Sequence, residues 1–177
     1  MLVTEWMYKV DFIVNLPVIK THRSASYSIC LKNFVGCTHV RQRPYVIDSS
    51  RWEEVVAELN LAYQPDLNIA DGTVSMIAGG PWEGTPSETS LIIAGTNRVA
   101  VDAVGLGVIK AFGQWAMVDQ KEVWEQKQIQ RAIELGIGKG KEEIVLLDAG
   151  KGREFEELIK KVRSETGLPK PEAGETV

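Results

Sequence analysis

Residues 98–112 read RVAVDAVGLGVIKAF, and this stretch constrains the fold more than any other part of the chain. Apolar side chains cover nearly every side of the helix that it predicts, despite the glycines at positions 105 and 107. A helix that is apolar all round is buried inside a protein rather than placed on its surface. We therefore expect residues 98–112 to form a buried helix.

Short apolar runs elsewhere predict strands. These runs are residues 10–16, 26–31, 67–70, 73–78, 90–94 and 143–148. Asp71-Gly72 separates two of them and is typical of a hairpin turn, because both residue types tolerate positive φ. Residues 79–88 hold three glycines and two prolines, which predicts a loop.

Three further helices are indicated. Ser50 and Glu53 form a capping pair that begins one of them, and Pro65 ends it. A second runs from Asp119 to Gly136, and the last ends at Gly167. Strands that are mostly apolar rather than alternating are covered strands. The predicted fold class is therefore α/β, with a mixed central sheet flanked by helices. It forms a single domain over residues 1–169, followed by a polar tail at 170–177.

Composition limits the functional class. The 177 residues are 44% hydrophobic and 25% charged, with a net charge of −4. An acidic chain does not predict binding to nucleic acid. The two cysteines, Cys30 and Cys37, are too few for a disulfide framework and are expected to be reduced. No apolar run is long enough to cross a bilayer, and no signal peptide pattern is visible. A cytoplasmic protein without membrane contact is expected.

Candidate ligand-binding side chains follow the first two predicted strands. Lys20-Thr21-His22 comes after the first strand, and Lys32-Asn33 comes after the second, with Gly36 close behind. Two ammonium groups, an amide and an imidazole suit a carboxylate or a phosphate, and the imidazole titrates near neutral pH. Strand ends are where open α/β sheets place ligands. The alternative is that these are ordinary surface residues.

Asp102 lies inside the buried helix. Burying a carboxylate costs several kcal/mol unless it is paired or hydrogen-bonded, so a partner is expected among Lys20, Lys32, Arg98 or a backbone N–H. Such a group is either a structural ion pair or a site carboxylate with a shifted pKa. For Asp71, the alternative to a hairpin turn is a metal ligand or general base.

Glycine and cysteine motifs add weaker signals. Residues 79–84 either bring backbone N–H groups close to an anion or form an ordered loop around Trp82. Gly150-Lys151-Gly152 precedes a helix and suits an anion at its N-terminus. Cys37, His39 and His22 offer metal ligands, but no C-x2-C pair accompanies them. Cys30 is expected in the core.

Five motifs in order resemble the family known as domain of unknown function 362. They are Leu16 to His22, Leu31 to Gly36, Asp71-Gly72, Gly80-Pro81 with Gly84, and Ala94-Gly95 through Val99 to Val104, and the resemblance covers residues 10–112. It implies that one site is formed by Lys20, His22, Lys32, Asn33, Asp71 and Asp102.

The chain also departs from that family. Asn97-Arg98 stands where relatives carry Asp-Pro, and the ferredoxin-like cysteine motifs of many relatives are absent here. Lys20 comes almost at the start, so the chain resembles the C-terminal, motif-bearing half of the family architecture. An open sheet edge is therefore expected to pair with a second copy or with another chain.

The resulting hypothesis is an enzyme, or an enzyme-like binder, that acts on a small anionic organic molecule. Lys20, Lys32 and Asn33 would hold the anion, together with Gly36, Gly80 and Gly84. His22 would move a proton, and Asp71 and Asp102 would orient His22 or hold a divalent metal ion. Two alternatives stay open: a non-catalytic accessory protein for a redox or iron–sulfur system, and a structural subunit with a vestigial pocket. A homodimer or larger assembly is expected.

Overall fold

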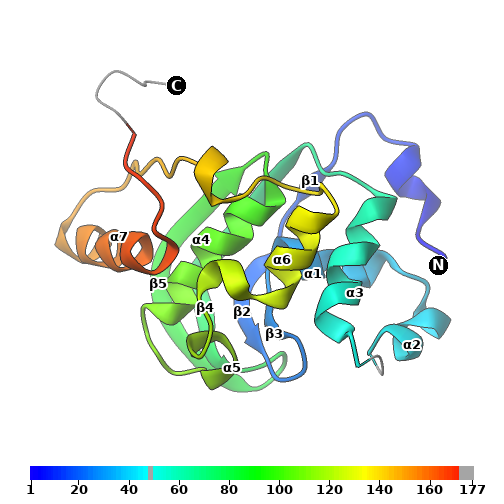
Figure 1. Cartoon of the computed structure of the whole chain (residues 1–177), viewed down its shortest axis with the longest axis horizontal. Coiled ribbons are helices and arrows are strands. Elements are labelled where there is room, and N and C mark those ends of the chain that lie inside the picture. The colour runs from blue at the N-terminus through cyan, green and yellow to red at the C-terminus, as the bar shows by residue number, and fades with distance from the viewer. Residues whose placement is uncertain (48–49, 172–177) are drawn as a thin grey trace.

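Helix α4 (Arg98–Lys110) crosses a five-stranded sheet in the computed structural model, which describes residues 1–47 and 50–171 (Figure 1). Every residue from Val101 to Ile109 is buried, so the predicted buried helix is confirmed. Figure 1 shows α7 (Arg153–Thr166) on one side of α4, with α6 (Lys127–Glu134) and α3 (Trp52–Leu59) on the other. Helix α4 is therefore covered by the sheet and by other helices, as its apolar surface requires.

The sheet is mixed. Its central strand is β4 (Leu67–Gly79), which pairs in parallel with β1 (Val14–Asn15) and β2 (Val18–His22), and antiparallel with β5 (Gly84–Gly95). Strand β3 (Ser26–Ser28) returns antiparallel beside β2. These strands and helices form one compact α/β domain, as the sequence predicts.

The remaining elements are short. They are the helices α1 (Cys30–Asn33), α2 (Arg43–Ile47) and α5 (Ala116–Asp119) and the 3-10 turns Glu5–Tyr8, Phe34–Cys37, Val40–Gln42, Asn60–Ala62, Val123–Glu125 and Lys141–Glu143. No helix within the described residues is long and apolar enough to cross a membrane.

The two faces of the sheet differ. Ile19, Ala70 and Leu91 are buried on the face toward α4. Because side chains alternate along a strand, their neighbours point the other way. The opposite face, called here the outer sheet face, includes Leu16, Val18, Lys20, Asp71, Val74 and Ile92.

The glycines of α4 allow close packing. A Cβ at Gly105 would lie 2.6 Å from the Cδ1 of Ile29, and one at Gly107 would lie 2.9 Å from the Cγ2 of Thr166 on α7. Larger residues at these positions would push away the segment that leads into α1 and the helix α7. The glycines therefore serve packing on both sides of the buried helix.

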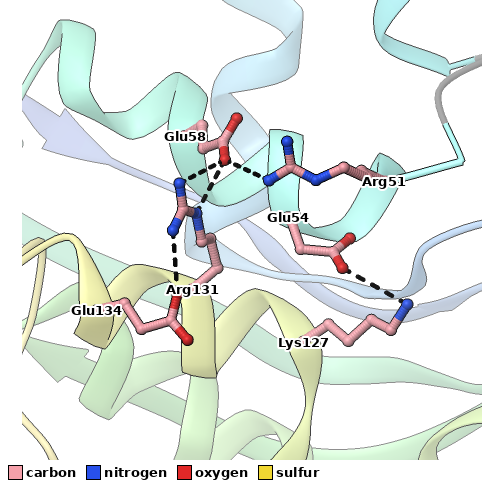
Figure 2. A network of polar contacts seen from close by, with 6 residues as sticks. All are labelled: Arg51, Glu54, Glu58, Lys127, Arg131 and Glu134. Atoms are coloured by element: carbon pink, nitrogen blue, oxygen red, sulfur yellow. Dashed lines mark hydrogen bonds and ion pairs between the residues drawn. The ribbon is translucent and has the colours of Figure 1, made fainter.

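Ion pairs join α3 to α6, as Figure 2 shows. Glu58 on α3 accepts from Arg131 on α6 and from Arg51, each at 2.8 Å. Arg131 also contacts Glu134, and Lys127 lies 3.6 Å from Glu54. These side chains are partly exposed, so each pair contributes at most about 1 kcal/mol. Their arrangement helps fix α3, whose first residue, Trp52, is buried.

The Asp71-Gly72 hairpin prediction is wrong, because β4 runs through both residues. Gly72 serves packing rather than turning: a Cβ there would lie 2.7 Å from the Cδ1 of Leu91 and 2.9 Å from that of Ile19. The hairpin turn lies between β4 and β5 instead, with positive φ at Gly79 and Gly80. The predicted loop 79–88 is therefore much shorter, and half of it, residues 84–88, belongs to β5.

The predicted strand at 143–148 is also wrong. The 3-10 turn Lys141–Glu143 includes its first residue, and residues 144–148 have no regular structure. Arg163 on α7 donates to the carbonyl of Leu146 and to the carboxylate of Asp148, both at 2.8 Å. These contacts, and the burial of Ile144, hold the segment against the helix rather than in the sheet.

Other boundaries shift as well. The first strand starts later than predicted, at Val14, and the second ends earlier, at Ser28. The predicted 119–136 helix is broken into α5, a 3-10 turn and α6. Helix α7 ends where predicted, with Gly167 as its C-cap residue in the left-handed conformation. Most of the predicted 170–177 tail lies outside the described residues.

The Ser50–Glu53 capping box is not formed. Helix α3 begins at Trp52 with Arg51 at the N-cap position, and no side chain caps it. The Glu53 carboxylate instead accepts from the hydroxyl of Ser26, 2.7 Å away. A tertiary contact with β3 has replaced the local one.

Gly80→Ala should lower the free energy of unfolding by about 2 kcal/mol or more. Its φ is +85°, and a Cβ there would meet the backbone oxygen of Thr21. Gly36→Ala is the matched control, because a Cβ at Gly36 has nothing within 4 Å. Urea unfolding followed by circular dichroism measures both; equal losses would contradict this explanation.

Candidate functional site

Three buried polar side chains hold the four-residue helix α1 in place. The Asp102 carboxylate accepts from the N–H of Cys30 (2.6 Å) and of Leu31 (3.2 Å). The Asn60 amide donates to the Leu31 carbonyl at 2.9 Å, and the Asn15 amide donates to the Cys30 carbonyl at 3.3 Å. The N–H and the carbonyl groups of Cys30 and Leu31 are therefore all bonded to buried side chains. Lys32 is the next residue along the chain, so its backbone position is fixed as well.

Asp102 is fully buried, and its partners are backbone N–H groups rather than a lysine. Burial raises the pKa of Asp102 to about 7, although the two N–H groups and the nearby charge of Arg98 oppose this shift. Arg98 itself donates to the Asn60 side-chain oxygen at 2.9 Å and to the Tyr63 carbonyl at 3.1 Å. The expected compensation is thus supplied mainly by the start of α1.

Lys32, on α1, is only partly exposed. Its ammonium nitrogen lies 5.3 Å from the centre of the Trp52 ring, a cation–π distance. Burial lowers the pKa of Lys32 to about 8, and the charge of Lys20 contributes to this. At neutral pH the side chain is still mostly protonated, but less firmly than an exposed lysine.

His22, the last residue of β2, is 8% exposed. Burial is the largest cause that lowers the pKa of His22 to about 4, and the charges of Lys32, Lys20 and Arg23 contribute to this, in that order. The imidazole is therefore neutral at pH 7. Its Nδ1 accepts from the N–H of Ser24 at 3.2 Å, which assigns the single ring proton to Nε2.

Lys20, Arg23 and Lys32 around His22 are called here the cationic cluster. Among residues 1–47 and 50–171, no ion pair joins any of its three cations to a carboxylate. Arg23 donates instead to the Gly80 carbonyl at 3.0 Å. Like charges gathered without a counter-ion repel one another, and an anion would relieve that repulsion.

Asn33 ends α1 beside Lys32 and begins a chain of amides. Its side chain donates to Asn15 at 2.8 Å, and Asn15 donates to Asn68 at 3.0 Å. Asn68 donates in turn to the carbonyl of Gly95 at 3.2 Å. Sequence reasoning missed Asn15, Asn60 and Asn68. For Asn15 and Asn68 the available signal was an asparagine inside a short apolar run, VDFIVNL or LNIA.

Asp71 makes no ion pair with the cationic cluster, although it shares the outer sheet face with Lys20. It is exposed on the outer sheet face, opposite Val18 and Ile92. Its Oδ1 accepts from the N–H and the hydroxyl of Thr73, which lower the pKa of the carboxyl. Asp71 is not among the charges that act on His22.

Among the predicted binding glycines, Gly80 contacts the cationic cluster, because its carbonyl accepts from Arg23 at 3.0 Å. Gly36 is exposed, and its carbonyl accepts from Arg43. Gly80 and Gly84 are required by close backbone approach in the β4–β5 turn. The structure thus gathers Lys20, His22 and Lys32, with Asn33 next to them on α1 and Asp102 bonded beneath that helix. The functional roles of all these residues remain predictions.

Lys20, His22, Lys32 and Asn33 do not follow strands as expected. Lys20 and His22 lie within β2, and Lys32 and Asn33 lie within α1. The antiparallel pairing of β2 with β3, followed at once by α1, is what brings the two segments together.

No group of three or more histidine, cysteine or acidic side chains suitable for a metal occurs in the part of the chain that the structure describes. Cys37 is half-buried, and the exposed His39 accepts from the N–H of Arg41. Cys30 is fully buried in the core, as expected. The divalent metal ion therefore remains a prediction without an evident ligand set.

A groove of about 1250 Å³ lies away from the cationic cluster. It runs between β5, α4, residues 144–152 and α7, and its lining includes none of Lys20, His22, Lys32, Asn33, Asp71 and Asp102. Its floor is apolar and includes Val101, Val104 and Phe112. This groove and the titratable cluster therefore do not coincide, and the charged side chains of the cluster favour it as the binding site.

Comparisons with known proteins agree with the motif pattern. The family model described as Domain of unknown function (DUF362) matches residues 1–107. The chain is also similar to the Thylakoid-associated protein sll1697 of Synechocystis sp. (strain ATCC 27184 / PCC 6803 / Kazusa), with 31% identity over 99 residues. That match covers 53% of this chain and 31% of the relative. No solved structure matches.

Opposite pH dependences are expected from two buried groups. The pKa of His22 is about 4 in the folded chain and 6.5 in the unfolded chain, so between these values the unfolded chain binds more protons. The free energy of unfolding should therefore rise as the pH rises from 4 to 6.5. The pKa of Asp102 is raised to about 7 in the folded chain, so between pH 4 and 7 the folded chain binds more protons. For this group the free energy of unfolding should fall as the pH rises from 4 to 7.

Asp102→Asn should reveal the pH dependence that His22 contributes, since the opposite pH dependences of His22 and Asp102 offset each other in the unmodified chain. Its free energy of unfolding should be lower by about 2 kcal/mol or more, because an amide cannot accept from both N–H groups, and it should rise more steeply from pH 4 to 6.5. His22→Gln should show the falling profile, and the exposed Asp11→Asn is the control. Parallel profiles for all variants in denaturant titrations would exclude this assignment.

Proposed function

This chain belongs to the family described as Domain of unknown function (DUF362), and we propose that it binds a small anionic organic molecule at the cationic cluster. The observation that carries the proposal is the set of cations around a neutral His22 without a carboxylate counter-ion in the described residues. A carboxylate or phosphate group on the ligand would supply the missing negative charge.

Lys32 is the principal anion-binding residue in this proposal. It is partly buried and rests on Trp52, so its ammonium group is held in place before a ligand arrives. A preorganised cation binds more tightly than a mobile one, because less side-chain freedom is lost. Lys20 adds a second charge from β2, and Asn33 lies at the end of α1. Asp102, Asn15 and Asn60 act as positioning residues, since they fix α1.

His22 is the proton-transfer group. In the free protein its pKa of about 4 makes it a weak base. A bound anion offsets the charges of Lys20 and Lys32, which raises the pKa of His22 toward neutrality. Ligand binding thus tunes the imidazole to accept a proton at the pH where it is needed. This account requires neither Asp71 nor a metal.

A non-catalytic accessory protein for a redox or iron–sulfur system is the second candidate. The apolar residues exposed on the outer sheet face favour it, because such a surface suits a protein partner. The expected cytoplasmic location remains a prediction, because the similar cyanobacterial protein is described as thylakoid-associated.

Anion binding should depend on Lys32. We expect Lys32→Met to weaken binding of inorganic phosphate or of malonate at least about tenfold by isothermal titration calorimetry, since one charge-assisted contact is lost. Comparing the two probes separates phosphate from carboxylate preference. Lys139→Met, at an exposed lysine paired with Glu143, is the matched control and should bind as the unmodified chain does.

Histidine NMR titrations provide an independent readout. The pKa of His22 should rise in Lys32→Met without ligand, because one repelling charge is gone, and it should rise in the unmodified chain when the better probe is added. Equal binding by Lys32→Met and the unmodified chain, with an unmoved pKa of His22, would refute the proposal.

A further inference from the structure

The outer sheet face carries an apolar patch, which is made of Leu16, Val18, Val74 and Ile92 and is interrupted by charged residues. Along β1 and β2 the alternation turns Asn15, Pro17 and Ile19 inward, and Leu16 and Val18 outward. Strand register places Asp71 of β4 between two members of the patch, Val18 of β2 and Ile92 of β5. The patch therefore extends over three neighbouring strands.

Its apolar members are well exposed. Leu16 and Ile92 are 65% and 66% exposed, and Val18 and Val74 are 44% and 48% exposed. Single exposed apolar residues are ordinary, but several of them on one sheet face mark an interaction surface. Helix α4 covers the other face, so the outer face of this half-covered sheet is the one left for a partner.

Two opposite charges lie in the same patch. Lys20 follows Val18 on β2, with Met76 as its neighbour on β4, and Asp71 lies one position back along the sheet, opposite Val18. Neither residue makes an ion pair with any described residue. A third charged residue, Glu88, lies toward the β5 edge, opposite Val74.

We infer that the outer sheet face binds a second copy of this chain, face to face. A two-fold interface requires a surface that complements itself, so each contact occurs twice. One unpaired cation and one unpaired carboxylate set in an apolar patch meet that requirement: Lys20 of each copy pairs with Asp71 of the other. Sheets pack face to face at a separation of about 10 Å, which brings such side chains within reach.

The assembly also bears on the candidate site. Within one chain Asp71 does not act on His22, whereas pairing with Lys20 of another copy would place it beside the cationic cluster. In such a dimer Asp71 would offset the charge of Lys20, and anion binding would depend mainly on Lys32. The inference itself rests on the apolar patch and its two charges, and it does not require anion binding. The two proposals can therefore fail separately.

Sedimentation equilibrium between about 1 and 300 µM tests the assembly, because small interfaces have dissociation constants in the micromolar range. The unmodified chain should approach twice the 19.6 kDa of one copy. Ile92→Asp should remain a single copy, because it buries a charge in the interface. Leu61→Asp is the matched control: Leu61 is 62% exposed but lies in the 3-10 turn after α3.

Charge reversal tests the proposed pairing. Lys20→Glu and Asp71→Lys should each weaken dimerisation about tenfold, because each creates like-charge contacts. An equimolar mixture of the two should form a mixed dimer with an affinity close to that of the unmodified chain, since both cross-pairs become attractive again.

Two results would overturn the inference. One is a mass of 19.6 kDa for the unmodified chain throughout the range, and the other is a dimer that neither Ile92→Asp nor the charge reversals weaken. Calorimetry of Ile92→Asp with the better anion separates the two proposals. If Ile92→Asp is a single copy and still binds the anion, both proposals are supported. If Ile92→Asp is a single copy but the unmodified chain binds no anion, only the interface is supported.

Discussion

The contact between the Asp102 carboxylate and the first two N–H groups of α1 is the interaction on which the rest of the structure depends. It crosses the core, from the most buried helix to a four-residue helix with little stability of its own. A carboxylate buried without partners costs several kcal/mol, and charge-assisted hydrogen bonds offset much of that cost. Lys32 is placed by this contact, and the pKa of His22 responds to Lys32. Packing in the centre of the domain thereby controls electrostatics at its edge.

Continuous apolar sequence made α4 predictable, because a helix that is apolar on all sides has one possible environment. The left-handed stop at Gly167 was equally local and equally predictable. Asp71-Gly72 shows where local reasoning ends. The dipeptide has the chemistry of a turn, but Gly72 is needed because Leu91 and Ile19 approach it from two other strands. The segment 143–148 has the composition of a strand, yet Arg163, far along the chain, binds its carbonyl and holds it against α7. Contacts of this kind are not encoded in a sequence window.

The candidate site was predictable in its residues more than in its geometry. Motif order pointed to Lys20, His22 and Lys32, and the charges of Lys20 and Lys32 do act on His22. Strand-end placement did not produce that proximity; the return of β3 and the immediate start of α1 did. The amide chain from Asn33 through Asn15 to Asn68 could not be derived, because each asparagine alone is an ordinary polar residue. Only the parallel pairing of β1 with β4 shows that two of them meet in the interior.

The direction of the pKa shifts separates structural from ligand-binding groups. Burial favours the neutral form of Asp102, of Lys32 and of His22, so the fold by itself disfavours charge at all three. Asp102 is fully buried, and its relief comes from backbone N–H groups that are permanent parts of the structure. Lys32 is partly exposed, and no carboxylate within the described residues relieves it. Asp102, whose carboxylate is hydrogen-bonded within the fold, therefore contributes to stability. Lys32 can be reached from solvent and has no carboxylate partner in the described part of the chain, so an anionic ligand can stabilise its charge. That difference is the physical reason to assign ligand binding to the lysines rather than to the aspartate that the sequence motif emphasises.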